Sequence, residues 1–203
     1  MDNYIKICGK KIKLTDEQVE QLKKGSCRDR VKLSDVAVGG TVKIGEYEFI
    51  VLERSGDTTA VICKDLLIKN KVFGKNNNYN GSNADVACSS FADEIADIIG
   101  ADNLVEHTVD LTSDDGLKDY GTIRRRASLL TTDLYRRYVV ILDKFKIDAW
   151  WWLATPYSTD THGSSSYVKC VSPSGRLDDY FCGFGGFGVR PFCILKSNIF
   201  VSK

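Results

Sequence analysis

The run Trp150-Trp151-Trp152-Leu153-Ala154-Thr155-Pro156 and the later Gly188-Val189-Arg190-Pro191 border the most informative stretch of this 203-residue chain. All three tryptophans and all three prolines lie between these borders. The segment between them is rich in Tyr, Ser, Gly, Phe and Asp. Such residues build recognition surfaces, because rings add contact area at low entropic cost and small residues add adaptable polar contacts. The stretch predicts a fixed frame around an adaptable surface.

Outside this stretch, hydrophobic periodicity predicts strands and two helices. Apolar and charged residues alternate over 41–52, which favours a half-buried antiparallel strand pair. One helix is expected from a cap at Ser89 or Ser90 to Gly100, and a second is opened by Thr131 or Thr132. The second carries Leu134, Tyr138 and Ile141 on one face. Further strands are expected at 58–63, 150–153, 167–171 and 189–195.

The expected fold class is therefore α+β, with two helices packed on a modest antiparallel sheet and long C-terminal loops. Loops of that length inside a compact domain are usually functional. Residues 4–8 and 11–14 predict a hairpin, and Thr15 with Gln18 predicts a capping box for a helix that Gly25 ends. We expect residues 1–35 to form a small attachment unit, which docks to a larger particle or mediates homo-oligomerisation, and residues 36–203 to form the main domain.

Composition excludes several classes. A net charge of +1 without a basic arm argues against nucleic acid as a partner. The sequence contains no run of about 18 apolar residues, so no membrane span is expected. The start lacks the pattern of a signal peptide, so we expect synthesis in the cytoplasm. Seven scattered cysteines without a CxxC pair predict reduced thiols, not a disulfide framework or a zinc site. No metal and no cofactor is expected.

The blocks Trp151-Trp152-Leu153-Ala154-Thr155-Pro156, Tyr167-Val168, Ser174-Gly175 and Gly188-Val189-Arg190-Pro191 resemble an uncharacterised family of bacterial and phage domains. That family is similar to the C-type-lectin and formylglycine-generating-enzyme folds. The resemblance covers roughly residues 36–196 and implies a C-type-lectin-like domain. Ala154 replaces the family's usual Arg, and the usual Asn-rich segment appears as 178–187, which contains no Asn.

That departure points to the variable proteins of diversity-generating retroelements, which share a lectin-like fold and change at adenines of a C-terminal coding segment. An Asn codon altered at its adenines gives Tyr, Asp, Ser, Gly, Cys or Phe, but not Lys, Glu, Gln, Met or Trp. Residues 176–187 contain none of those five types. Across 153–195, Lys169 is the single residue of these types. The resemblance therefore implies a hypervariable receptor-binding surface on a phage or prophage protein, which is either virion-associated or displayed at a cell surface.

The candidate binding surface combines aromatic and small polar residues that polar neighbours cannot bury, and exposed clusters of that kind mark interaction sites. Its members are Tyr157, Ser158, Asp160, His162, Tyr180, Phe181, Cys182, Phe184 and Phe187. The alternative for Phe184 and Phe187 is that they plug the core. The expected structural frame is Trp151, Trp152, Gly188, Arg190 and Pro191. Arg190 is expected to be buried with a carboxylate partner or as a fork on loop carbonyls, and His107 to lie on the surface.

Three functional classes remain open. The first is a non-catalytic receptor-recognition protein that binds a protein or a glycan on a cell surface. The second is a structural particle protein that contacts other phage structural proteins. The third is a thiol-dependent oxidase using Cys182 and Cys193, which would need thiols of lowered pKa. A catalytic role for His162 lacks a rigid nucleophile, and calcium-dependent sugar binding lacks enough oxygen ligands around Asp160, Asp178 and Asp179.

Overall fold

The computed structural model describes residues 4–7, 10–18 and 30–202, and it confirms the α+β class. An eight-stranded antiparallel sheet has the order β10-β14-β6-β5-β4-β15-β3, with β7 paired to β14. Its strands are β3 (Arg30–Lys32), β4 (Thr41–Ile44), β5 (Tyr47–Ser55), β6 (Thr58–Cys63), β7 (Leu104–Val105), β10 (Ala127–Ser128), β14 (Phe192–Lys196) and β15 (Phe200–Ser202).

A second, three-stranded antiparallel sheet carries the C-terminal loops. It consists of β11 (Trp151–Pro156), β12 (Tyr167–Val171) and β13 (Leu177–Phe181), in that order. The hairpin of β8 (His107–Asp110) and β9 (Thr122–Arg125) stands beside it, and short 3-10 turns are η1 (Leu33–Asp35), η2 (Ala101–Asn103), η3 (Asp143–Phe145) and η4 (Asp160–His162). An isolated parallel bridge joins Trp151 to Gly188, so the two borders of the informative stretch meet in space.

Helix α2 (Asn83–Ile99) begins six or seven residues before the expected cap at Ser89 or Ser90. Ser82 is the N-cap, because its hydroxyl accepts the backbone N–H of Asp85 at 3.1 Å. Asp85 in turn accepts the backbone N–H of Gly81 at 2.9 Å. Residues with modest helix propensity fill the first turns, and burial of Ala84 and Cys88 in the core overrides that weak preference. Gly100 ends the helix as expected, with φ at 88°.

Helix α3 (Thr132–Leu142) begins where the sequence predicts it. The Thr131 hydroxyl accepts the backbone N–H of Leu134 at 3.3 Å. Its buried face is Tyr135, Tyr138 and Leu142, whereas Leu134 is only partly buried. The expected face is therefore confirmed at Tyr138, while Leu134 and Ile141 lie partly buried against the same cluster.

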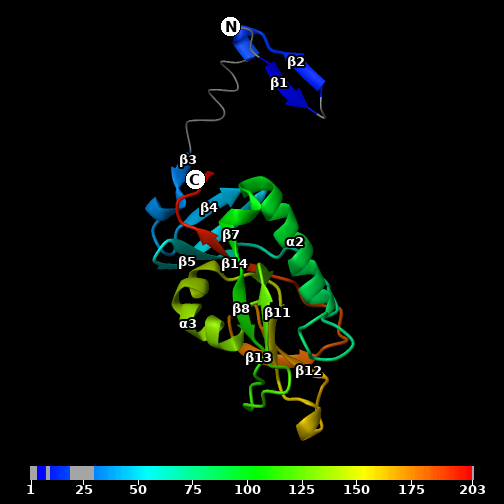
Figure 1. The fold of residues 1–203 in the computed structure, drawn as a ribbon. Helices are drawn as coiled ribbons and strands as arrows, with labels where there is room; N and C mark the ends of the chain where they lie inside the picture. The colour runs from blue at the N-terminus through cyan, green and yellow to red at the C-terminus, as the bar shows by residue number, and fades with distance from the viewer. Residues whose placement is uncertain (1–3, 8–9, 19–29, 203) are drawn as a thin grey trace.

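The central sheet is covered on both faces, as Figure 1 shows with α2 and α3 on opposite sides. Phe49 and Val51 of β5 pack in the cluster that contains α2 residues, and Ile50 and Leu52 pack in the cluster that contains α3 residues. The expectation of a half-buried strand pair is thus wrong for the centre of β5, where all four residues from Phe49 to Leu52 are buried. The alternation of side chains along β5 decides which of the two core clusters each residue joins, but not whether the residue is buried.

At the N-terminus, β1 (Tyr4–Ile7) and β2 (Lys10–Lys13) form the expected hairpin. The capping box is present as well, since Thr15 and Gln18 exchange side-chain to backbone hydrogen bonds of 3.0 and 3.2 Å. Gly25, the expected helix end, lies outside the described residues. The boundary at residue 35 falls too late, because β3 pairs with β15 and Leu33 is fully buried in the main core. No helix among the described residues is long and apolar enough to cross a membrane.

His107 is buried, with 8% of its surface exposed, which corrects its expected surface position. Its Nε2 lies 2.9 Å from the hydroxyl of Ser128, and its ring stands edge-on to Phe192 at 5.2 Å. Burial lowers the pKa of His107 to about 4, with a smaller lowering from Arg124, against raising effects of the Val105 backbone and Glu106. The alternating strand places His107 on the inner face of β8.

We expect His107 to make the protein acid-sensitive. Its pKa falls from about 6.5 unfolded to about 4 folded, so the unfolded chain binds the extra proton between these values and stability falls as pH drops. The full effect is about 3 kcal/mol of unfolding free energy. Chemical denaturation at pH 7, 5.5 and 4 measures it, with His107→Gln as the variant that no longer titrates. An equal pH slope in both proteins would rule this assignment out.

Candidate functional site

The frame residues lie on the first strand of the second sheet and on the segment that follows Phe187. Trp152 and Trp151 follow each other on β11 and point to opposite faces, into the α2 core and the α3 core respectively. Both are buried, so Trp151 does not face a groove. The indole N–H of Trp152 donates to the backbone carbonyl of Lys71 at 2.8 Å. Gly188 is required where it stands, because an added Cβ would collide with Leu66 and approach the Ile68 carbonyl to 3.0 Å.

Arg190 is fully buried in the frame. It donates to the backbone carbonyls of Cys63 and Lys64, each at 2.9 Å, and to that of Phe145 at 3.4 Å. Its guanidinium lies 5.1 Å from the centre of the Trp151 ring. The carbonyl fork is as expected, but no carboxylate pairs with Arg190 among the ion pairs of the described chain. These three backbone carbonyls supply enough acceptors for the guanidinium, so a carboxylate partner is unnecessary.

Five exposed rings gather around β13, and we call them the aromatic edge: Tyr157, Tyr167, Tyr180, Phe181 and Phe184. On one face, Tyr180 and Phe184 lie 4.8 Å apart and both contact the buried Phe187, which stacks on Trp150 at 5.2 Å. On the other face, Phe181 stands opposite Tyr167 in the strand register. Tyr180 and Phe184 are thus anchored to the buried Phe187.

Glycines support two of these rings. A Cβ on Gly183 would lie 2.5 Å from Cε1 of Phe181, and one on Gly186 would collide with the Phe184 ring. Each ring therefore lies against bare backbone. By contrast, a Cβ on Gly185 would meet only Val72, at 3.6 Å. The glycines of this segment fix where the rings rest, which is a physical reason for their number.

The loop that carries Tyr157 is tied down by two carboxylates from the loop after β8. Asp115 accepts the hydroxyl of Ser158 at 2.7 Å and Nδ1 of His162 at 2.9 Å. These donors, together with the hydroxyl of Ser113, hold the pKa of Asp115 well below its usual value. Asp119 accepts the hydroxyls of Thr159 and Thr161, each at 2.5 Å, and they lower its pKa too.

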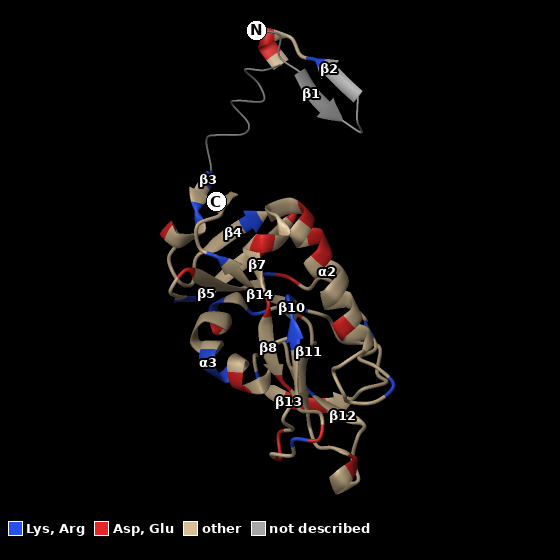
Figure 2. Cartoon of the chain, in the orientation of Figure 1, with Lys and Arg blue, Asp and Glu red and all other residues tan. Residues whose placement is uncertain are grey.

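This network does not make a nucleophile. Ser158 and His162 both donate to the same carboxylate, so the imidazole holds no serine hydroxyl as a base would. His162 and Asp160 are exposed, as expected for contact residues. Figure 2 shows the acidic residues that gather in the loops beside β12 and β13. No group of three or more His, Cys, Asp or Glu side chains could hold a metal ion in the part of the chain that the structure describes.

Three of the nine expected surface residues are buried, which corrects their assignment. Ser158 is turned inward onto Asp115, and Cys182 and Phe187 lie in the core cluster under α2. Phe187 is 5% exposed, while Phe184, only three residues earlier, is 40% exposed. Phe187 therefore fills the core, as the alternative interpretation predicted, whereas Phe184 does not. The residue missing from the sequence-based surface is Tyr167, whose position at the start of an alternating strand was the available signal.

The thiols are unsuited to the oxidase mechanism. Cys182 and Cys193 are both buried, and they are free thiols, as are the other three described cysteines. Burial raises the pKa of Cys182 and raises that of Cys193 strongly. A thiolate mechanism needs the opposite shift. These two side chains instead pack as small apolar residues.

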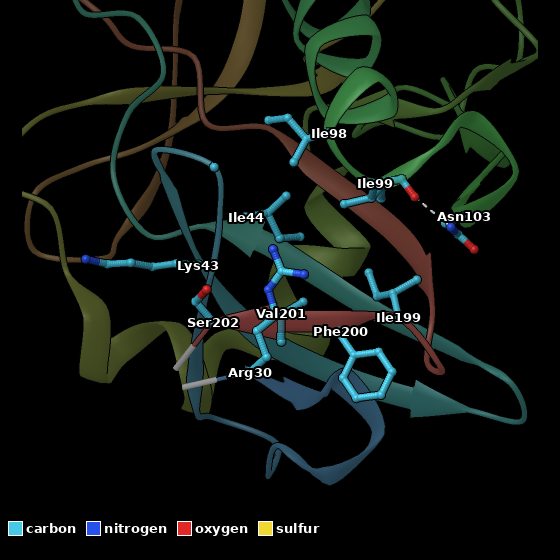
Figure 3. A pocket seen from close by; sticks show the side chains of 11 residues that line it. Arg30, Lys43, Ile44, Ile98, Ile99, Asn103, Ile199, Phe200, Val201 and Ser202 are labelled. Atoms are coloured by element: carbon cyan, nitrogen blue, oxygen red, sulfur yellow. Dashed lines mark hydrogen bonds between the residues drawn. The ribbon is translucent and has the colours of Figure 1, made fainter. Parts of the chain in front are cut away.

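A separate hollow of about 370 Å³ lies at the other end of the fold, between the end of α2 and β15 (Figure 3). Ile44, Ile98 and Ile199 line it together with Arg30 and Lys43. None of the nine expected surface residues lines this hollow. The aromatic edge and this hollow are therefore separate places on the protein.

One family model matches the chain, a domain of unknown function named DUF6273, over residues 126–197. No curated protein and no solved structure matches. The matched range contains α3, the whole three-stranded sheet and β14, so the aromatic edge and the frame residues fall within the matched range.

Proposed function

We propose that this chain is a non-catalytic recognition protein with a C-type-lectin-like fold, which binds a protein or glycan on a cell surface through the aromatic edge. The carrying observation is that Tyr180, Phe181 and Phe184 are each 40–50% exposed, yet Tyr180 and Phe184 rest on the buried Phe187, and Phe181 and Phe184 lie against glycine backbone. Rigid exposed aromatics bind at low entropic cost. The fold assignment draws support from two helices that flank an antiparallel sheet, with a smaller sheet carrying the long loops.

Binding is tested with two probes, a displayed library of random linear peptides and a glycan array. We expect one of them to yield a ligand for the full chain. Serine at Tyr180, Phe181 or Phe184 should weaken that ligand about 30-fold per ring, the size of an interface hot spot. Phe200→Ser is the matched control, because Phe200 is 59% exposed on β15 in the other sheet. Equal binding by the ring variants would refute the site, and no ligand from either probe would refute the function.

The glycines give a second prediction. Gly183→Ala should weaken the same ligand about tenfold, since the new Cβ displaces the Phe181 ring while leaving its chemistry unchanged. Gly185→Ala should bind like the wild type, because its Cβ has ordinary contact with Val72. Titration calorimetry measures both. Because the Phe181 ring is half exposed, the new Cβ displaces it into solvent and not into the core, so we expect unfolding free energies within about 0.5 kcal/mol of wild type.

We further propose that a retroelement diversifies this surface and that the protein is phage-associated. The composition of 176–187 supports it, as does the position of exposed and buried residues there. The flanking DNA should contain a near-copy of the segment encoding 153–191 that differs almost only at adenines, beside a reverse-transcriptase gene. Variants should change Tyr180, Phe181 and Phe184 and leave Phe187 intact. A locus without such a copy would remove diversification while leaving the binding surface.

A further inference from the structure

Strand β13 has one unpaired edge. It lies at the end of the three-stranded sheet and pairs only with β12. Ser172 N–H donates to the Arg176 carbonyl and Cys182 N–H to the Ser166 carbonyl, which fixes the phase of the ladder. Because hydrogen-bonded pairs alternate along an antiparallel ladder, the backbone groups of Leu177, Asp179 and Phe181 point away from β12. No other described strand lies along them.

Two of these six outward groups are already satisfied. The N–H of Asp179 donates to Oδ1 of Asp178 at 3.0 Å, and the carbonyl of Phe181 accepts the N–H of Phe184 at 2.9 Å. The remaining four are the N–H and carbonyl of Leu177, the carbonyl of Asp179 and the N–H of Phe181. None has a protein partner within the described chain. A row of such groups is a template for one more strand.

The side chains on the two faces of this edge repeat one pattern. Asp178 and Tyr180 share one face, with Phe184 beside Tyr180 at 4.8 Å. Asp179 and Phe181 share the other face, where Phe181 stands opposite Tyr167. Each face therefore offers one carboxylate followed by an exposed aromatic pair.

This pattern suits Lys and Arg. Their aliphatic stems cover rings, their charges are attracted to ring faces, and their heads reach carboxylates. Asp178 is 39% exposed and bonded to Arg176 at 2.7 Å, and Asp179 is 33% exposed and 3.6 Å from Lys169. Both carboxylates thus remain open to a second cation. A strand alternates its side chains between the two faces, so it would place successive side chains on the two ring pairs in turn.

We propose that the β13 edge binds an extended, basic segment of a partner protein by strand addition, with Lys or Arg side chains over the two ring pairs. This inference rests on the proposed function and narrows its partner from protein or glycan to peptide. Main-chain hydrogen bonds supply affinity in this mode, and the side-chain pattern supplies specificity.

The test starts from the displayed library of random linear peptides and the full chain. Selected peptides should be enriched in Lys and Arg. Scanning one of them with single N-methyl groups should weaken binding at least tenfold at every second residue and leave the residues between unaffected, since alternate N–H groups face the edge. Asp178→Asn with Asp179→Asn should weaken binding roughly tenfold, whereas Asp97→Asn, an exposed carboxylate on α2, should not.

Uniform tolerance of N-methylation, or selected peptides without basic residues, would overturn strand addition. A glycan that binds through Tyr180, Phe181 and Phe184 in the absence of any peptide ligand would overturn it as well, while leaving the proposed function standing. Failure of both probes would instead remove the proposed function itself, so the two ideas fail by different outcomes.

Discussion

We expect Arg190→Met to lower the free energy of unfolding by about 3–5 kcal/mol, because it leaves one buried and two partly buried backbone carbonyls without their donor. The carbonyls of Cys63, Lys64 and Phe145 have this guanidinium as donor. Burial lowers the pKa of Arg190 to about 10, so the group keeps its proton at neutral pH. Methionine retains much of the volume, so the loss reports the hydrogen bonds and the contact with Trp151 rather than a cavity.

Urea denaturation at pH 7 measures this loss. Arg190→Lys should recover part of it, because an ammonium reaches one or two of the carbonyls but lacks the planar fork. Arg176→Met is the matched control, since the Arg176 side chain is largely exposed at the start of β13, and its change should stay within about 0.5 kcal/mol. A loss below about 1 kcal/mol for Arg190→Met would show that water reaches the carbonyls and that the residue does not hold the frame.

The frame was predictable because it follows local rules. Thr131 caps the start of α3 and Gly100 ends α2, as capping chemistry predicts. Trp151 and Trp152 face opposite sides because strand side chains alternate. The sequence could not reveal that α2 and α3 cover both faces of the sheets, so burial was underestimated at β5 and at His107. Whether a sheet face is covered depends on helices that lie far from its strands in the sequence.

Strand β13 escaped prediction because Leu177-Asp178-Asp179-Tyr180-Phe181 has no apolar alternation, and both its charged pair and its rings are typical of a loop tip. The turn at Pro173–Gly175 was the available signal for a hairpin. Exposure within the candidate surface was right for Tyr180 and Phe184 and wrong for Cys182, which lies just beyond the end of β13 and packs in the core cluster that contains α2 residues.

Long-range polar contacts were not predictable at all. The loop after Tyr157 reads as a Ser-rich adaptable segment, yet Asp115, Asp119 and Asn77 bind it from more than 35 residues away. No spacing rule connects such partners. The consequence for function is that this loop presents Tyr157 from a fixed position, and the residue that fixes it most is Asn77.

Asn77 is fully buried, and both polar atoms of its side chain and its backbone N–H have partners. Its Nδ2 donates to the carbonyls of Ser158 at 2.8 Å and Tyr167 at 2.9 Å. Its Oδ1 accepts the Tyr120 hydroxyl at 2.8 Å, and its backbone N–H donates to the carbonyl of Ser165 at 2.8 Å. One amide therefore joins the Tyr157 loop to the start of β12, where Tyr167 belongs to the aromatic edge.

Asn77→Asp should cost about 3–5 kcal/mol of unfolding free energy at pH 7, because a buried carboxylate replaces the donor and faces two carbonyl oxygens. The surrounding acceptors and burial raise the pKa of the new carboxyl above its unfolded value near 3.9. Stability linked to such a group is present below the unfolded pKa and lost as pH rises through the folded one. The deficit relative to wild type should therefore shrink as pH falls toward 4, where the neutral acid donates one hydrogen bond.

Asn77→Ala separates this charge effect from the loss of the clamp. It leaves the same carbonyls without a donor and should cost about 2–3 kcal/mol at every pH, since it introduces no titrating group. Differences from wild type, taken by urea denaturation at pH 7, 5.5 and 4, cancel the contribution of His107 that all three proteins share. Parallel pH curves for the two variants would mean that water or a shifted loop solvates position 77. The Tyr157 loop would then not be held by this amide, and its rigidity would have to come from Asp115 and Asp119 alone.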